Sequence, residues 1–204
     1  MEYLLSVALF AVSSSVTPGP NNIMVMTSGV NFGARKSLPL LSGICVGFTI
    51  MLLLVGVGFG QVFHFFPQLE LIIKVLGSAY LLYLAWQIAI TKEIGRGQQQ
   101  GAPFGFMKGA LFQWVNAKAW VVAIGAISAF TTVGEGYFSQ NLTIAGTFLV
   151  ASFPCVGVWL MFGSALRRWL TKQHYLRWFN LTMALLLVVS IVPVIRGVVE
   201  QIIV

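Results

Sequence analysis

The sequence predicts an all-α protein that crosses a membrane six times, and three observations lead to that prediction. Of its 204 residues, 58% are hydrophobic and only 8% are charged, whereas soluble domains carry about 25% charged residues. So few ionic groups cannot coat the surface of a water-soluble globule. Six apolar stretches follow one another, each close to the roughly 20 residues that a helix needs to cross a bilayer. The connections between them are short, which leaves no room for a soluble domain.

The six stretches are expected to be helices, because backbone polar groups in lipid must bond within their own segment. None of them shows the alternation of a barrel strand of about 10 residues. Their expected bounds are, in order, Tyr3–Met26, Leu38–Val62, Leu69–Ile90, Phe106–Phe130, Leu142–Phe162 and Leu176–Ile195.

The connections differ in charge, and this difference predicts the orientation in the membrane. The chain has a formal net charge of +7, from 12 Lys+Arg against 5 Asp+Glu. In a soluble protein this excess would suggest nucleic acid, but here basic residues lie between apolar stretches, so no nucleic-acid partner is expected. The second and fourth connections, Phe63–Gln68 and Thr131–Asn141, hold no basic residue. By the positive-inside rule, the other three connections lie in the cytoplasm and both termini lie outside. Their basic residues are Arg35, Lys36, Lys92, Arg96, Lys108, Arg167, Arg168, Lys172 and Arg177.

The first and fourth stretches are each interrupted near the middle, which suggests an internal repeat. Thr17 and Asn116, in the two interruptions, lie 99 residues apart, and Gly43 and Gly146, in the second and fifth stretches, lie 103 apart. Each half has three helices, an odd number, so the halves are expected to be inverted, as in many secondary transporters. We therefore predict two inverted three-helix repeats in one transmembrane domain, residues 1–204. The first repeat covers about 1–90, the linker about 91–105 and the second repeat about 106–204.

The first interruption is the run Thr17-Pro18-Gly19-Pro20-Asn21-Asn22. Two prolines remove two backbone donors and break a helix, and the glycine between them adds conformational freedom. Broken backbone at mid-membrane is tolerated beside a polar cavity, where helix N-termini favour a carboxylate and free carbonyls favour an ammonium group or cation. The asparagines add amide groups at the same depth. We therefore predict that one wall of a substrate site is formed by Pro18, Gly19, Pro20, Asn21 and Asn22. The alternative is a kink that serves packing alone.

The second interruption is the run Gln113-Trp114-Val115-Asn116-Ala117-Lys118. Lys118 is the ionisable residue that lies deepest in a predicted span, roughly 18 Å from its start at helical rise. A charge at a helix centre costs about 2.5–3.5 kcal/mol, so the lysine should face a cavity or a partner. No acid lies at its depth, which leaves backbone carbonyls, asparagine side chains or a substrate carboxylate. We predict that Asn116 and Lys118 form the second wall; a lysine that snorkels to the interface is the alternative.

Residue types that are missing argue against other functions. The chain has no Asp, and no His or Glu lies deep in a predicted span, so an intramembrane hydrolase would lack a base. No nucleotide-binding loop is present. Cys45 and Cys155 form no CxxC pair, so we expect two small hydrophobes rather than a metal or electron-carrying site. No enzyme activity, cofactor or metal is therefore expected.

Small residues predict close helix contacts. The pairs Gly43/Gly47 and Gly105/Gly109 each have the four-residue spacing that lets helices approach closely. Packing within the chain is the expected use, and the same spacing would also suit the interface of a homo-oligomer.

Taken together, these motifs resemble the LysE/RhtB family of amino-acid exporters. The resemblance covers the whole chain in length, span number and motif order. It implies a bacterial inner-membrane protein that exports amino acids or their derivatives, driven by an ion gradient, with the proton as the expected coupling ion. The family's usual fourth-span motif is Asn-Pro-Lys, and Ala117 replaces its proline, which makes a complete break there less expected. The residues that carry this family resemblance are Thr17-Pro18-Gly19-Pro20-Asn21, Gly43, Gly47, Gly77-Ser78-Ala79-Tyr80-Leu81 and Asn116-Ala117-Lys118.

The sequence thus predicts a secondary transporter whose amino-acid substrate binds at the bilayer midplane between the two breaks. The run from Gln113 to Lys118 is most similar to the branch that exports cysteine and O-acetylserine. The expected partners are the amino acid, the coupling ion and the lipid bilayer. The alternative is a membrane scaffold, or a subunit of a membrane complex, that transports nothing.

Overall fold

The structure, a computed structural model, describes the chain except residues 59–66, 92–102, 133, 171 and 204. Across the described ranges every regular element is a helix, which confirms the predicted all-α class. Residues 63–66 of the second connection and the linker residues Lys92 and Arg96 lie outside the described residues, whereas Pro67 and Gln68 are the first residues of a helix. The elements are α1 (Glu2–Val16), α2 (Pro20–Phe32), α3 (Ala34–Gly56), α5 (Pro67–Ile90), α6 (Phe106–Phe112), the 3₁₀ helix η2 (Gln113–Val115), α7 (Ala117–Phe130), α8 (Tyr137–Leu166) and α9 (Gln173–Ile203).

The first predicted span is broken into α1 and α2, whose axes differ in direction by 56°. Pro20 is the first residue of α2, a position where the missing N–H costs no helical bond. The span also runs further than predicted, because α2 continues to Phe32. Most of the predicted first connection, Gly29–Ser37, is therefore helical. Gly33 alone separates α2 from α3, with a φ of 83° that favours glycine.

The fourth predicted span is also broken, and the expectation that Ala117 would weaken this break is wrong. The axes before and after Asn116 differ by 71°, more than at the first break. Asn116 has an extended backbone, and its side-chain oxygen accepts a hydrogen bond from the backbone N–H of Lys118 at 3.2 Å. An asparagine at this position satisfies an otherwise unpaired amide at the start of a helix. Capping thus starts α7 here without a proline.

The number of candidate spans agrees with the six apolar stretches. Within the described residues, four helices are long and apolar enough to cross a membrane, and the number reaches six if each bent pair counts as one span. The helices of the fifth and sixth predicted spans, α8 and α9, are longer than predicted, since α8 begins at Tyr137 and α9 reaches Ile203.

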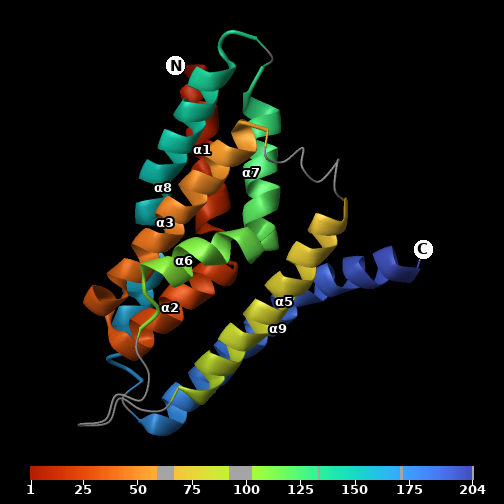
Figure 1. The fold of residues 1–204 in the computed structure, drawn as a ribbon. Helices are drawn as coiled ribbons and strands as arrows, with labels where there is room; N and C mark the ends of the chain where they lie inside the picture. Colours follow the sequence, from red (N-terminus) through yellow and green to blue (C-terminus); the bar gives the residue numbers. More distant parts are fainter. Residues whose placement is uncertain (59–66, 92–102, 133, 171, 204) are drawn as a thin grey trace.

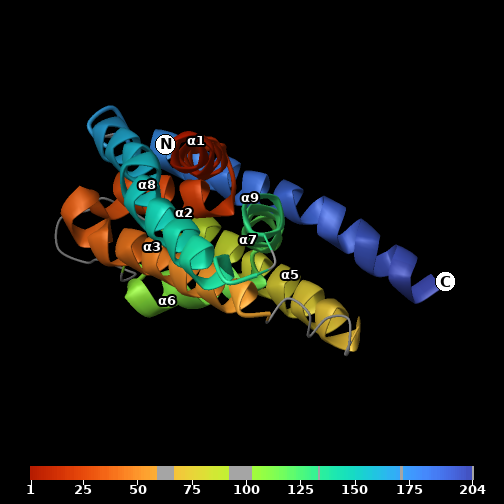
Figure 2. The ribbon, with the colours of Figure 1, turned by 90° about the horizontal axis from the view of Figure 1, so that it is seen from above.

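The helices form two packed groups. In the larger group α3 and α8 run antiparallel against each other, α1 packs on α8, and α6 packs on α3 (Figure 1). In the second group α5 and α9 pair along their lengths, and this pair contacts the rest of the molecule through η2 and α2. Figure 2 shows the same pair extending to one side of the larger group.

Glycines allow α3 and α6 to cross in close contact, as the sequence predicted for packing within the chain. A Cβ at Gly43 would collide with the carbonyl oxygen of Phe106, and one at Gly109 would lie 2.6 Å from the carbonyl oxygen of Leu40. Gly47 is equally close to the backbone of α6. The prediction is wrong for Gly105, beside which a Cβ would meet nothing within 4 Å. This crossing holds the fourth span's first half against the centre of the molecule.

Buried apolar side chains form two clusters with a polar layer between them. The α2-side cluster joins α2 and Phe112 of α6 to parts of α3, α5, α8 and α9, and the α7-side cluster joins α1 and α7 to the remaining parts of α3 and α8. On α3 the division falls between Cys45 and Phe48, and on α8 it falls between Phe148 and Val156. Each cluster therefore contains one half of each broken span, with both breaks at the boundary.

Most of the basic residues in the described part of the chain lie towards one end of the molecule. They occupy the start of α3, the end of α8 and the start of α9, which meet at the lower end in Figure 1, and the start of α6, which lies above them; Lys74, Lys118 and Arg196 lie elsewhere. The described part of the opposite end holds the start of α1 and the segment between α7 and α8. The charge asymmetry read from the connections is therefore also an asymmetry of the folded molecule.

Candidate functional site

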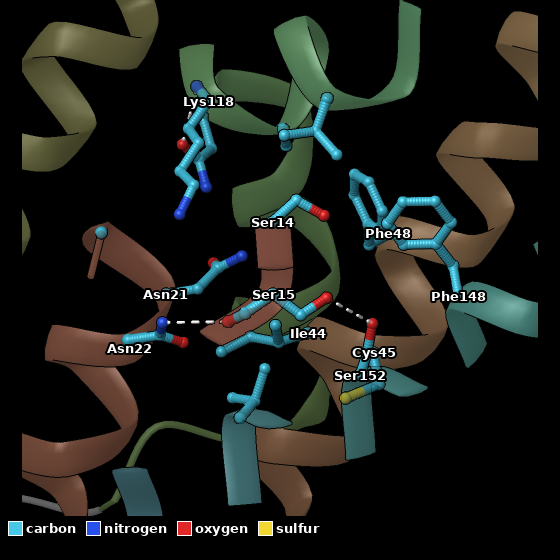
Figure 3. A pocket seen from close by; sticks show the side chains of 15 residues that line it. Ser14, Ser15, Asn21, Asn22, Ile44, Cys45, Phe48, Lys118, Phe148 and Ser152 are labelled. Carbon is cyan, nitrogen blue, oxygen red and sulfur yellow. Dashed lines mark hydrogen bonds between the residues drawn. The ribbon is translucent and has the colours of Figure 1, made fainter. Parts of the chain in front are cut away.

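The two helix breaks face each other across a small cavity at the boundary of the two apolar clusters. Its volume is about 50 Å³, which is space for one or two water molecules, since the share of one water is about 30 Å³. Figure 3 shows Lys118 extending from one wall towards Asn21 and Asn22 on the other, with Phe48 and Phe148 closing the far side. The lining residues are Ser14, Ser15, Gly19, Asn21, Asn22, Ile44, Cys45, Phe48, Asn116, Lys118, Ala119, Val122, Phe148, Ser152 and Val156.

Lys118 bridges the two breaks. Its Nζ donates a hydrogen bond to the backbone carbonyl oxygen of Thr17 at 2.7 Å. This is one of the three kinds of partner that the sequence left open. Gly19 allows the approach, because a Cβ there would lie 3.0 Å from the Cδ of Lys118. The positive charge of Lys118 also lies beside the C-terminal end of α1, where it interacts favourably with the partial negative charge of that helix end.

The carbonyls freed by the first break are satisfied by side chains rather than by backbone. Asn22 Nδ2 donates to the carbonyl oxygens of Thr17 at 2.9 Å and Ser15 at 3.1 Å. The indole N–H of Trp159 donates to the carbonyl oxygen of Val16 at 3.1 Å. Asn22 is buried and its Oδ1 has no partner. One acceptor at the cavity wall is therefore available to a ligand.

A second link between the breaks involves a residue that the sequence analysis did not assign to the site. Asn21 and Gln113 exchange two hydrogen bonds, at 2.9 and 3.0 Å, between their side-chain amides. Gln113 is fully buried and also donates to the carbonyl oxygen of Gly109 at 2.9 Å. The signal was present, because Gln113 is an uncharged polar residue within an apolar stretch. What the sequence could not show was which asparagine it would meet.

The serines of α1 and α8 add to the polar layer. Ser15 and Ser152 face each other with their oxygens 3.4 Å apart (Figure 3). Ser14 donates to carbonyl oxygens one turn earlier in α1, at 2.7 and 3.2 Å. Ser152 is separated by more than one hundred residues from the first break, so its place in the cavity follows from the packing of α8 on α1.

The structure brings five of the seven predicted site residues to the cavity wall: Gly19, Asn21, Asn22, Asn116 and Lys118. Pro18 and Pro20 do not line it; Pro18 is exposed and Pro20 is buried at the start of α2. Asn116 lines the cavity but uses its oxygen to cap α7. The prolines and Asn116 therefore shape the backbone around the cavity.

The arrangement suits a zwitterion. Two helices, α2 and α7, begin beside the cavity, and their N-terminal ends favour negative charge together with Lys118. The C-terminal end of α1, with its carbonyls, and the free Oδ1 of Asn22 favour positive charge. Across the described ranges no group of three His, Cys, Asp or Glu side chains is placed to hold a metal ion. Cys45 and Cys155 are buried free thiols.

Comparison with known proteins identifies the family. The model of the LysE type translocator family matches residues 12–195, which is most of the chain. The chain belongs to the LysE type translocator family. The resemblance seen in the Thr17-Pro18-Gly19-Pro20-Asn21 motif is thereby confirmed. As a LysE translocator with several apolar helices, the protein is a multi-pass membrane protein.

Similar proteins within this LysE family come from enteric bacteria. The chain is 32% identical to the "Cysteine/O-acetylserine efflux protein" of Salmonella typhimurium, over 88% of this chain and 90% of that protein. It is also 32% identical to the protein of the same name from Escherichia coli K12, with the same coverage. A third, from Klebsiella pneumoniae, is 36% identical over 59% of this chain and 61% of its own length. No solved structure matches the chain.

Proposed function

We propose that this protein is a secondary transporter that exports cysteine, O-acetylserine or a similarly small neutral amino acid from the bacterial cytoplasm. The observation that carries the proposal is the junction of the two breaks, where Lys118 on one reaches the Thr17 carbonyl on the other. Family membership and the names of the relatives support export of an amino acid. They do not favour a membrane scaffold, in which both breaks would serve packing alone.

The substrate would bind in the cavity by exchanging partners with the protein. Its carboxylate would take the place of the Thr17 carbonyl as the partner of Lys118, close to the N-terminal ends of α2 and α7. Its ammonium group would then meet the released carbonyl and the free Oδ1 of Asn22. The cavity of about 50 Å³ is smaller than a cysteine molecule, so binding requires the two breaks to separate.

The arrangement of the helices supports alternating access by two inverted three-helix repeats within one transport domain. The packing of α1, from the first half, on α8, from the second, matches that of α6, from the second half, on α3, from the first. The pairs α3/α8 and α5/α9 each join corresponding helices in antiparallel fashion. Each apolar cluster holds one half of each broken span. A rocking motion at the boundary would open the cavity to one side and then to the other.

The orientation proposed is that of the positive-inside rule. The end that carries the basic residues would face the cytoplasm, and both termini would lie outside, in the bacterial inner membrane. An ion gradient would drive export, with the proton as the proposed coupling ion. Lys118 is the lining residue that carries a charge and therefore the candidate to respond to it.

The test is export of radiolabelled cysteine from bacterial cells that lack their own cysteine exporters. Cells that express the protein should release preloaded label faster than cells with an empty vector, and a protonophore should abolish the difference. A matched panel of labelled neutral and basic amino acids should show faster release for small neutral ones. A correctly inserted protein that accelerates release of none of them would overturn the proposal and support the scaffold.

A further inference from the structure

A second cavity, distinct from the one between the breaks, lies at the basic end of the molecule. Its volume is about 530 Å³, within the range of about 300–1,000 Å³ that is usual for small-molecule sites. It lies between α2, the end of α5 and the start of α6. We call it the vestibule, and its lining residues are Met24, Thr27, Ser28, Asn31, Phe32, Gln87, Ile88, Ile90, Thr91, Pro103, Phe104 and Lys108.

Thr27 gives the vestibule an unused hydrogen-bonding group. Its side chain is 4% exposed, and its hydroxyl has no hydrogen-bond partner. A helical threonine usually bonds to the carbonyl oxygen four residues earlier. Seven others in the described part of the chain do so: Thr17, Thr49, Thr91, Thr131, Thr143, Thr147 and Thr182. Because an unpaired buried hydroxyl is costly, Thr27 is placed to receive a polar ligand.

The other groups around Thr27 define which ligand. Lys108 supplies a cation, and its Nζ lies 4.8 Å from the centre of the Phe104 ring, another lining residue. No acidic side chain is found among the described residues that line the vestibule, so those residues offer no carboxylate to an isolated cation. The last turns of α2 and α5 border it, and helix C-terminal ends favour positive charge. One fixed positive group opposite two helix C-terminal ends fits a zwitterion.

Helix α2 contributes residues to both the vestibule and the central cavity. Asn22 lines the central cavity and Thr27 lines the vestibule, both on α2. Five residues of helix separate them by about 8 Å along the axis. Because five positions also turn the helix by about 140°, the two residues point to different sides of α2, and a ligand passing between the cavities would move around this helix as well as along it.

We infer that the vestibule is a loading site that binds a small α-amino acid on the cytoplasmic side before the central cavity opens. Lys108 binds the carboxylate, and the hydroxyl of Thr27, with the helix C-terminal ends, receives the ammonium group. The inference rests on the proposed export function for its direction of travel, but binding to the vestibule can be measured without transport.

The binding experiment uses purified full-length protein in detergent, with radiolabelled L-cysteine kept reduced by a phosphine. Lys118→Met serves as the parent, so that the central cavity lacks its charge. This parent should bind cysteine, and adding Lys108→Gln or Thr27→Val should weaken binding at least about tenfold, the loss expected for one hydrogen bond to a charged group. Thr27→Ser keeps the hydroxyl and should bind normally. Lys36→Gln, an exposed lysine at the same end of the molecule, is the matched charge control.

Two analogues separate the roles of the two residues. 3-Mercaptopropionate lacks the ammonium group and should compete with cysteine in the parent but not after Lys108→Gln. Cysteamine lacks the carboxylate, so Lys108→Gln should leave its weak competition unchanged while Thr27→Val removes it. If cysteine does not bind to the parent, or binds equally to the parent, Lys108→Gln and Thr27→Val, the loading site is overturned.

Transport by inside-out vesicles distinguishes failure of the vestibule from failure of the export function. With Lys118 intact, Lys108→Gln should raise the half-saturating cysteine concentration at least about tenfold and leave the maximal rate close to wild type. Lys118→Met should lower the maximal rate instead. An unchanged half-saturating concentration in both vestibule variants would overturn the loading site while export stands. If the wild type transports nothing, export fails and the binding assay alone decides the vestibule.

Discussion

Replacing Lys118 by methionine should separate membrane insertion from transport. The substitution removes a charge that costs about 2.5–3.5 kcal/mol at a helix centre. It also removes the hydrogen bond from Nζ to the Thr17 carbonyl, worth about 1.5–3 kcal/mol for a charged donor. Asn22 still donates to that carbonyl, so no unpaired acceptor remains. The two effects nearly cancel, and the abundance of the variant in membranes should stay close to that of wild type.

Transport should respond very differently to the same substitution. A substrate carboxylate that loses its cationic partner in a site shielded from water loses about 3–5 kcal/mol. The rate of cysteine uptake by inside-out vesicles should therefore fall by about 10²–10⁴-fold, measured beside membrane abundance by immunoblot. Lys118→Arg keeps the charge, but Gly19 leaves little space beside Lys118, since a Cβ there would lie 3.0 Å from Cδ. The planar guanidinium should reduce the rate by about 10–100-fold.

Lys36→Met provides the control, because Lys36 is exposed in the first turn of α3. It should leave both abundance and rate unchanged. Wild-type transport by a Lys118→Met protein of normal abundance would refute the reasoning, since the lysine would then be a structural bridge between the breaks. Normal transport by Lys118→Arg would refute the requirement for a compact ammonium group.

Three further predictions concern the first break, the helix crossing and the orientation. Replacing Pro18 and Pro20 together by alanine restores two backbone donors, so α1 and α2 should tend to join, and vesicle transport should fall at least about tenfold in a protein that still inserts. Gly43→Val should force α3 and α6 apart, lower the melting temperature in detergent and cost about 1–3 kcal/mol by overpacking. With the two buried native cysteines replaced by alanine, Glu135→Cys should react with an impermeant thiol reagent in intact cells, and Gln173→Cys should not.

Each of these has its own control and contrary result. Normal export by the double alanine variant would support a packing role for the prolines. Gly146→Val is the control for Gly43→Val, because a Cβ at Gly146 meets nothing within 4 Å; equal melting of the two variants would contradict the close crossing. Labelling of Gln173→Cys from outside would invert the orientation and place the vestibule on the external face.

The class of protein, the number of apolar stretches and the positions of both breaks can be read from the amino-acid sequence alone. Composition and the length of the stretches set the first two, because a bilayer accepts only long apolar helices with satisfied backbones. The first break could be predicted because two prolines act locally, whatever surrounds them. The deep lysine was recognised as an exception because its cost depends on depth alone.

How these parts meet depends on the fold and could not be read from the sequence. The partner of Lys118 is a backbone carbonyl, and the partner of Asn21 is Gln113, a residue 92 positions away. The complete second break depends on the capping oxygen of Asn116, a role that a motif with Ala117 in place of proline does not reveal. Ser152 and the vestibule around Thr27 likewise come from helices distant in the chain. Hydrogen bonds and cavities between helices depend on which faces of the helices pack together. Close contacts such as that of α3 with α6 at Gly43 determine this packing, and they depend on how the helix surfaces fit in three dimensions rather than on the local sequence.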